Sequence, residues 1–257
     1  MSDLYREEAG AGSPVVLVHE AVGDSRMWDP QWETFPRSHR TVRFDQRGYG
    51  RSPLEPGTMS HARDLIDLLD EIGLARASLV GGSLGGRVAL EVAVAQPDRV
   101  EKLVLLNPGL PGHDWSQEVQ AGWAEEEAEL ERGDLDAAVE VNLRMWFDGP
   151  HRSADEVDPE LRARVGELQR RAFEVQLPVG DDVREELLVP DLADRLGEVQ
   201  APTLVVIGDD DAPDMHAIAD RLAREIPDAR RASMPGAHVA SLEHPDEFDR
   251  IVLEFLS

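Results

Sequence analysis

Short apolar runs alternate with amphipathic stretches in two separate parts of this chain. The runs are rich in Val, Leu and Ile, a composition typical of strands buried on both faces. They predict strands at residues 15–18, 41–44, 77–80, 103–106, 203–207 and 230–233. The stretches between them repeat apolar positions every three or four residues, as amphipathic helices do. They predict helices at residues 60–72, 84–95, 214–225 and 245–255.

This alternation predicts the α/β class, with a mostly parallel sheet covered by helices on both faces. In the first predicted helix, Leu65, Ile66, Leu68, Leu69 and Ile72 form one apolar stripe. Parallel sheets of this kind place their sites outside the carboxyl ends of the strands. Chemistry is therefore expected in the loops that directly follow the predicted strands.

Residues 109–200 interrupt the alternation. The segment is acidic and mainly helical in pattern, and it lies between two predicted sheet strands. We therefore predict a core formed by residues 1–108 and 201–257, with residues 109–200 inserted as a helical cap. The aromatic residues of the segment either line a pocket or hold the cap together: Trp115, Trp123, Trp146, Phe147 and Phe173.

Charge narrows the choice of partners. The 257 residues include 52 acidic and 26 basic ones, a formal net charge of −26, and Lys102 is the single lysine. Nucleic acids and anionic membranes repel such a chain, so neither is expected as a partner. The acid excess fits adaptation to high salt, and the scarcity of lysine equally fits a base composition that favours arginine.

The cysteine count and the polar N-terminus bear on the kinds of site and on the location expected for the protein. The chain has no cysteine, which excludes disulfides, thiolate metal sites and a cysteine nucleophile. No signal peptide or transmembrane run is predicted, so a cytoplasmic protein is expected. No cluster has metal-ligand spacing, and neither a metal nor a cofactor is expected.

Candidate chemistry begins with Ser83, in the pattern Gly81-x-Ser83-x-Gly85 between a predicted strand and a predicted helix. A serine in such a tight turn has an unusual backbone conformation, and the turn closes only if its neighbours are small. The turn directs the hydroxyl away from the sheet edge. The first turn of the following helix points its N–H groups at the same place, where an oxyanion would develop. The pattern therefore predicts a nucleophilic serine.

An activated serine needs a base and a carboxylate that orients the base. His238 follows the last predicted strand, and Asp211 follows the strand before it, so the chain order is Ser83, Asp211, His238. His238 would accept the proton of Ser83, and Asp211 would hold the histidine in the right tautomer. The alternatives are His19, His216 and His244 for the base, and Asp209, Asp210 and Asp214 for the acid.

With these motifs the chain resembles the α/β-hydrolase superfamily over nearly its whole length. Besides Gly81-x-Ser83-x-Gly85, residues 45–52 (DQRGYGRS) are similar to the D-x-R-G-x-G-x-S loop of that family. Gly208-x-x-Asp211 matches the position of the family's acid, and His238 with the following LEHPDEF segment resembles its histidine loop. The resemblance implies the Ser83–Asp211–His238 triad and a structural role for residues 45–52.

The resemblance has one departure, at Glu20. Family members commonly have His-Gly after the corresponding strand, with a Trp nine residues after the His; here His19 and Trp28 keep that spacing, but Glu20 replaces the Gly. The alignment implies that the N–H groups of Ala21 and Leu84 form the oxyanion hole. A Gly allows backbone angles that Glu adopts only with strain, so Glu20 is expected to distort the hole. The alternatives are that it brings a carboxylate to the mouth of the pocket or points into solvent.

A finer resemblance links residues 27–31 and 145–147 to the 3-oxoadipate enol-lactonase branch. It implies that Glu20, Trp28, Trp146 and Phe147 lie at a substrate pocket. The expected function is hydrolysis of a small carboxylic ester or lactone through an acyl-enzyme on Ser83. A carbon–carbon bond hydrolase with the same triad and a non-catalytic ligand-binding protein are the alternatives, and the oligomeric state is left open.

Overall fold

In the computed structural model, which describes residues 4–257, seven strands form one sheet in the order β1-β3-β2-β5-β6-β8-β9. Its strands are β1 (Arg6–Ala9), β2 (Pro14–Val18), β3 (Arg40–Phe44), β5 (Ala77–Gly82), β6 (Val100–Leu106), β8 (Thr203–Gly208) and β9 (Ala229–Met234). Only the edge strand β1 is antiparallel to its neighbour in this sheet, and the remaining pairs are parallel. The mostly parallel sheet predicted from the alternation is confirmed.

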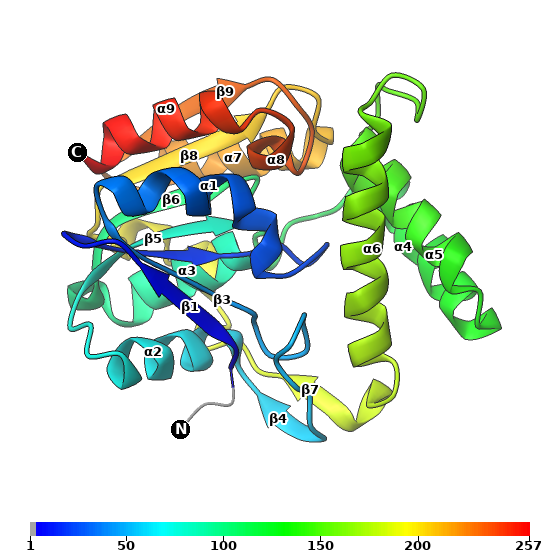
Figure 1. The fold of residues 1–257 in the computed structure, drawn as a ribbon, viewed down its shortest axis with the longest axis horizontal. Helices are drawn as coiled ribbons and strands as arrows, with labels where there is room; N and C mark the ends of the chain where they lie inside the picture. The colour runs from blue at the N-terminus through cyan, green and yellow to red at the C-terminus, as the bar shows by residue number, and fades with distance from the viewer. Residues whose placement is uncertain (1–3) are drawn as a thin grey trace.

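Helices cover both faces of the sheet (Figure 1). The helices outside the inserted segment are α1 (Asp29–Thr34), α2 (His61–Glu71), α3 (Leu84–Ala95), α7 (Pro213–Glu225), α8 (Ala240–Glu243) and α9 (Pro245–Leu256). α1 and α9 lie on one face, and α2, α3 and α7 lie on the other. This two-sided cover explains why the central strands are apolar at nearly every position.

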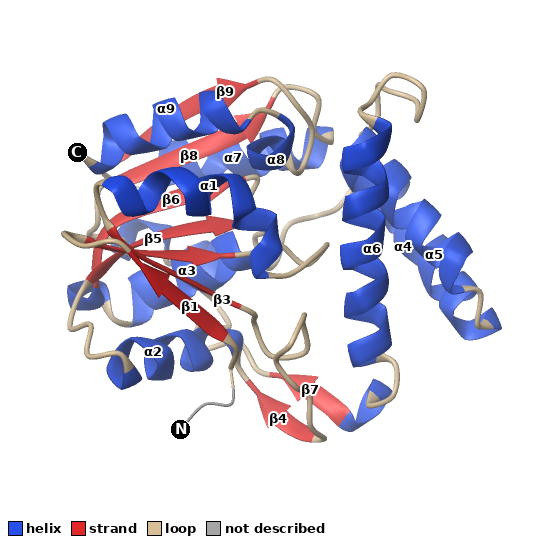
Figure 2. Cartoon of the chain, in the orientation of Figure 1, coloured by secondary structure: helices blue, strands red, loops and turns tan. Residues whose placement is uncertain are grey.

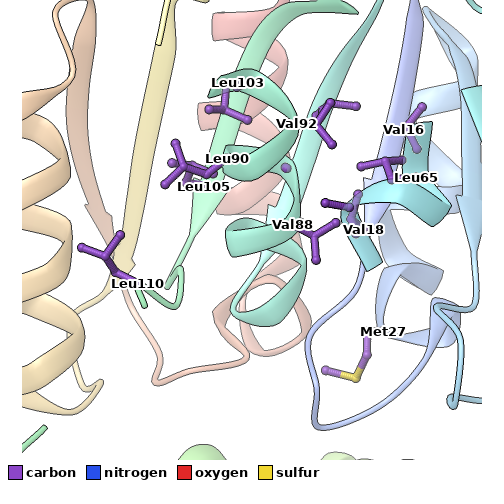
Figure 3. Close-up of a cluster of buried hydrophobic side chains, with 14 of the residues drawn as sticks. Val16, Val18, Met27, Leu65, Val88, Leu90, Val92, Leu103, Leu105 and Leu110 are labelled. Atoms are coloured by element: carbon purple, nitrogen blue, oxygen red, sulfur yellow. The ribbon is translucent and has the colours of Figure 1, made fainter. Parts of the chain in front are cut away.

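Each face of the sheet has its own hydrophobic core. Successive residues of a strand point to opposite faces, so Val16 and Val18 of β2 belong to one core and Val15 and Leu17 to the other. Figure 3 shows the first core, where side chains of α2 and α3 pack on those of β2 and β6. The second core contains Phe248 of α9.

The six predicted strands and four predicted helices of the core are all present, with ends displaced by a few residues at most. The strand β1 was not predicted because its sequence, REEA, is polar and alternates between exposed and half-buried positions. The six-residue helix α1 is too short to show a helical period. Contacts with neighbouring elements, rather than the local sequence, determine these two structures: β1 pairs with β3, and α1 packs against α9.

The inserted segment contributes α4 (Gln117–Arg132), α5 (Leu135–Asn142), a π-helical stretch at Leu143–Asp148 and α6 (Pro159–Gln176). These helices stand together beside the carboxyl ends of the parallel strands (Figure 2). Its later part returns to the core: β7 (Val183–Glu185) pairs with β4 (Gly57–Met59), and Leu192 is fully buried in the first core. Because the helices of this segment stand together at the carboxyl edge of the sheet, we propose residues 109–200 as the cap.

Charged side chains attach the cap segment to the core. Arg164 of α6 donates to Asp29 of α1 over 2.5 Å. Arg87 of α3 pairs with Glu185 of β7 over 2.6 Å. The buried carboxylate of Glu91 accepts from the backbone N–H of Leu188 over 2.7 Å. Across residues 4–257 no helix combines the length and the hydropathy needed to cross a bilayer.

Candidate active site

Ser83 occupies the sharp turn between β5 and α3. Its backbone has φ +47° and ψ −111°, outside the regions that L residues ordinarily adopt. Such a conformation costs on the order of 1–3 kcal/mol and persists only where the surroundings hold it. A Cβ at Gly81 would lie 2.3 Å from the carbonyl oxygen of Gly85, and one at Gly85 would lie 2.1 Å from that of Val18. The turn therefore requires glycine on both sides of the serine.

The backbone of Ser83 is fixed from two sides while its side chain stays accessible. Its N–H donates to Leu106 of β6 over 2.9 Å, and its carbonyl accepts from Gly109 over 3.1 Å. The residue is half-exposed, unlike the buried glycines before it. Within residues 4–257 the hydroxyl makes no hydrogen bond to His238; such catalytic hydrogen bonds often tighten only when substrate is bound.

His238 and Asp211 form a buried pair. Nδ1 of His238 lies 2.9 Å from Oδ2 of Asp211, and the other carboxylate oxygen accepts from the N–H of Ala212 over 2.7 Å. Both side chains are almost fully buried. A carboxylate at Nδ1 leaves Nε2 free to act as the base.

The other candidate acids lie elsewhere. Asp209 is exposed, and Asp210 is half-exposed, 3.8 Å from Arg152. Asp214 is buried, but its carboxylate accepts from the N–H of Ser116 over 2.8 Å and lies 3.2 Å from Nε2 of His113. Asp214 thus anchors the start of the cap segment, and Asp211 is the acid that contacts His238.

The other candidate bases have different surroundings. Both ring nitrogens of the buried His19 are engaged, one with the carbonyl of Glu20 over 2.7 Å and one with the N–H of Gln46 over 2.9 Å. His216 lies on α7, 3.4 Å from an Arg231 nitrogen. His244 precedes α9 and makes no side-chain capping bond.

Opposing effects act on the charge of His238. Burial alone would lower the pKa of its imidazole, but the carboxylate of Asp211, with a further contribution from that of Glu20, outweighs it and raises the pKa above its ordinary value. The protonated form of the His238 imidazole is therefore favoured at this position.

Asn107 was missed by the sequence analysis, although it directly follows the strand β6. Its side-chain amide donates to the carbonyls of His238 and Ala237 over 2.7 and 3.1 Å, and its Oδ1 accepts from the N–H of Gly208 over 2.9 Å. Asn107 thus ties the histidine loop to the ends of β6 and β8. A polar residue directly after a buried strand is the signal that would have found it.

The two predicted oxyanion donors lie at the carboxyl ends of neighbouring strands. Leu84 is the first residue of α3, where N–H groups have no partner within the helix. Ala21 lies in the turn after β2, which is the neighbour of β5. The chain leaves β2 towards α1 on one face of the sheet and β5 towards α3 on the other, so the two loops diverge at this edge of the sheet.

Glu20 does not have the strained backbone that was expected at its position. Its φ is not positive, since the described non-glycine residues with positive φ are Ser83 and Asn107, so the expected backbone strain is absent. The side chain is fully buried, and neither carboxylate oxygen has a hydrogen-bond partner in the described part of the chain. Glu20 is an internal carboxyl rather than a group at an open pocket mouth.

The three aromatic pocket candidates divide between the core and the site. Trp28 is fully buried against Phe248, with ring centroids 5.8 Å apart, and Phe147 is also buried in a core, so we assign both to packing. Trp146, in the π-helical stretch of the cap, lies with its ring centroid 4.6 Å from that of His238. An irregular turn of this kind often marks a functional position.

A cavity of about 620 Å³ is lined by residues of the cap helices together with Ala212 and Pro213, which directly follow Asp211. Val119 and Gly122 of α4, Val141 of α5 and Trp146 are among its lining residues, whereas Ser83 and His238 are not. No group of three or more His, Asp or Glu side chains within residues 4–257 is placed to hold a metal ion.

Comparison with known proteins identifies the family to which this fold belongs. A family model described as "alpha/beta hydrolase fold" matches residues 13–245. A protein of Azorhizobium caulinodans named "Putative carbamate hydrolase RutD" is 30% identical over 99% of this chain and 95% of its own. The 2-hydroxy-6-oxo-6-phenylhexa-2,4-dienoate hydrolase of Burkholderia cepacia is 26% identical over 99% and 91%. The structure of a thermophilic esterase from Thermogutta terrifontis superposes with a TM-score of 0.80 and 26% identity, covering 98% of this chain and 92% of that one.

Proposed function

This chain belongs to the alpha/beta hydrolase family, and from that premise we propose that it is a serine hydrolase of small carboxylic esters or lactones. The observation that carries the proposal is the buried His238–Asp211 pair, 2.9 Å apart, at the same edge of the sheet as the strained and accessible Ser83. A serine in this conformation, supplied with an oriented base, is suited to acyl transfer.

In the proposed reaction, Nε2 of His238 takes the proton of Ser83 as the hydroxyl oxygen attacks the substrate carbonyl. The negative oxygen of the tetrahedral intermediate is bound by the N–H groups of Ala21 and Leu84. The intermediate collapses to an acyl-enzyme, and His238 gives its proton to the leaving alkoxide. The same histidine then activates water, which releases the acid and restores the serine.

A carbon–carbon bond hydrolase is the second candidate, supported by the name of the Burkholderia cepacia relative. A dienoate substrate carries a carboxylate and therefore needs a cation to bind it. Arg87 is already paired with Glu91 and Glu185, and Arg152 is paired with Glu243. His238 itself faces two carboxylates, which favours a neutral ester or lactone.

The deciding experiment is hydrolysis of p-nitrophenyl esters from acetate to octanoate, with carbamate, lactone and dienoate substrates assayed in parallel. Ester or lactone turnover by the wild type supports the proposal, and the chain-length profile measures the site beneath the cap. Turnover of the dienoate alone supports the second candidate. Labelling by a serine-directed phosphonate separates both from a protein that only binds ligands, because an inert serine does not react.

A further inference from the structure

Glu20 carries a carboxyl group that the triad mechanism does not use. Its side chain is fully inaccessible to solvent, and neither oxygen accepts a hydrogen bond within the described residues. Buried charged groups are normally paired, because an unpaired one costs several kcal/mol. A neutral glutamine or an apolar residue would fill this space at lower cost, so the acid at this position calls for a functional explanation.

The carboxyl lies beside the nucleophile turn. A Cβ added to Gly82, the residue before Ser83, would lie 2.4 Å from Oε1 of Glu20 and 2.7 Å from its Cδ. The absence of a side chain at Gly82 therefore makes room for this acid. In the chain, Glu20 also directly precedes Ala21, the proposed oxyanion donor.

The charged group that acts on Glu20 is the catalytic histidine. His238 favours the ionised form of Glu20, and Glu20 in turn favours the protonated form of His238. The second charge on His238 comes from Asp211 in the loop after β8. The strand β5 brings Gly82 next to the acid.

Charged groups of the neighbouring elements are paired among themselves. Glu243 of α8 is held by Arg152 over 2.7 Å. Asp24, before the short 3-10 helix Ser25–Trp28, is held by Arg26 over 2.6 Å. Asp45 accepts from the N–H of Arg51 and lies 3.4 Å from its guanidinium. Unlike these carboxylates, that of Glu20 has no hydrogen-bond partner within the described residues.

We propose that Glu20 is a positioning residue that supplies His238 with a second carboxylate, so that two acids rather than one stabilise the imidazolium formed when Ser83 loses its proton. The inference rests on the proposed serine-hydrolase function. Burial raises the pKa of Glu20 to about 7, so the group changes charge near neutral pH, where the reaction would run.

The sign of the effect follows from electrostatics. A carboxylate raises the pKa of a neighbouring imidazole, so the neutral variant Glu20→Gln lowers the pKa of His238. A shift of about one pH unit corresponds to about tenfold weaker stabilisation of the imidazolium. If Glu20 only filled space, the isosteric amide in Glu20→Gln would leave the pKa of His238 unchanged.

The first test is NMR titration of the His238 ring protons, assigned by comparison with His238→Gln. We expect a lower His238 pKa, by about one unit, in Glu20→Gln, and recovery towards the wild-type value in Glu20→Asp. The matched control is Asp249→Asn on α9, because Asp249 is another buried carboxyl whose pKa is raised by burial. In this variant the pKa of His238 should equal that of the wild type. An unchanged His238 pKa in Glu20→Gln overturns the inference.

The second test is the pH profile of ester hydrolysis in the same variants. We expect the acid limb of kcat/KM for Glu20→Gln to move to lower pH, and the plateau of kcat to fall about tenfold with little change in KM. An unmoved limb and plateau count against the role of Glu20. If the wild-type protein hydrolyses no substrate, the proposed function is contradicted instead. The NMR titration alone then tests whether Glu20 interacts with His238.

Discussion

The carboxyl of Glu20 occupies the space that a side chain at Gly82 would need, with 2.4 Å between Oε1 and the position of a Cβ. Glu20 lies in the loop after β2, and Gly82 is the last residue of the neighbouring parallel strand β5. Glu20 places an acid inside the protein, and Gly82 leaves room for it directly before Ser83. Substitution at either position is therefore expected to affect the other.

Gly82→Ala should overpack this contact and lower the free energy of unfolding by about 1–3 kcal/mol, because the surrounding chain holds the Glu20 side chain in place. Replacing Glu20 by Ala in the same chain should relieve most of that loss. Urea unfolding of the two single variants and the double variant measures the coupling. Additive losses would show that the two side-chain positions do not compete for space.

Ser83→Ala should lower the turnover of an activated ester by roughly 10⁴-fold or more, because no other group replaces the nucleophile. The fold should persist, since alanine removes only an accessible hydroxyl. Initial rates with p-nitrophenyl acetate, together with circular dichroism, test both statements. Comparable rates in variant and wild type would remove Ser83 from the mechanism.

Asp211→Asn should reduce kcat on the order of 10³–10⁴-fold, because the amide no longer holds His238 in the productive tautomer. The neighbouring variant Asp210→Asn is the matched control, because the Asp210 side chain faces solvent and Arg152 instead. Steady-state kinetics of the two variants identify the acid. Greater sensitivity at Asp210 would contradict the assignment made from the 2.9 Å contact.

Asn107→Ala should destabilise the protein by roughly 1–3 kcal/mol, because it leaves buried backbone groups without their partners. It should also lower kcat, since the carbonyl of His238 loses its 2.7 Å hydrogen bond to the Asn107 side chain. Thermal unfolding and kcat measured on one preparation test both effects. A stable variant with normal kcat would show that the histidine loop is held by other contacts.

Glu20→Gln should stabilise the protein at pH 8 by about 3 kcal/mol and leave its stability unchanged near pH 4. Burial raises the pKa of Glu20 from 4.5 to about 7, so the folded state keeps a proton that the unfolded state loses in that window. Stability of the wild type therefore falls as the pH rises through this range, whereas the amide does not titrate.

Urea unfolding at pH 4, 6 and 8 measures this difference. Asp249→Asn serves for comparison, because the asparagine can still accept the hydrogen bond that Gln31 donates to Asp249 over 3.0 Å. Loss of stability in Glu20→Gln at pH 8 would mean that the carboxylate has stabilising partners in the folded protein.

The sequence by itself determined the elements whose pattern is strong and local. The apolar runs identified six strands of the central sheet, and the glycines around Ser83 identified the strained turn. Both follow from nearest-neighbour physics: buried strands need apolar side chains, and a tight turn needs residues without a Cβ. The placement of Ser83, Asp211 and His238 in the loops after three strands of the sheet was equally readable, because parallel strands bring their carboxyl ends to one edge.

Only the tertiary structure decided how these residues meet. Asp211 is one of four aspartates that lie close together in the chain, and the fold places its carboxylate against His238. Trp28 and Trp146 were equivalent aromatic candidates, yet Trp28 is packed in the core and Trp146 lies against His238.

Glu20 shows the same limit most clearly. Its position in the sequence suggested backbone strain or an exposed carboxylate, whereas its side chain is enclosed beside Gly82, a residue 62 positions away in the chain. Burial, the absence of hydrogen-bond partners and the attraction of His238 arise from segments that are distant in sequence. The charge of a buried group depends on that three-dimensional environment, which no local pattern of residues encodes.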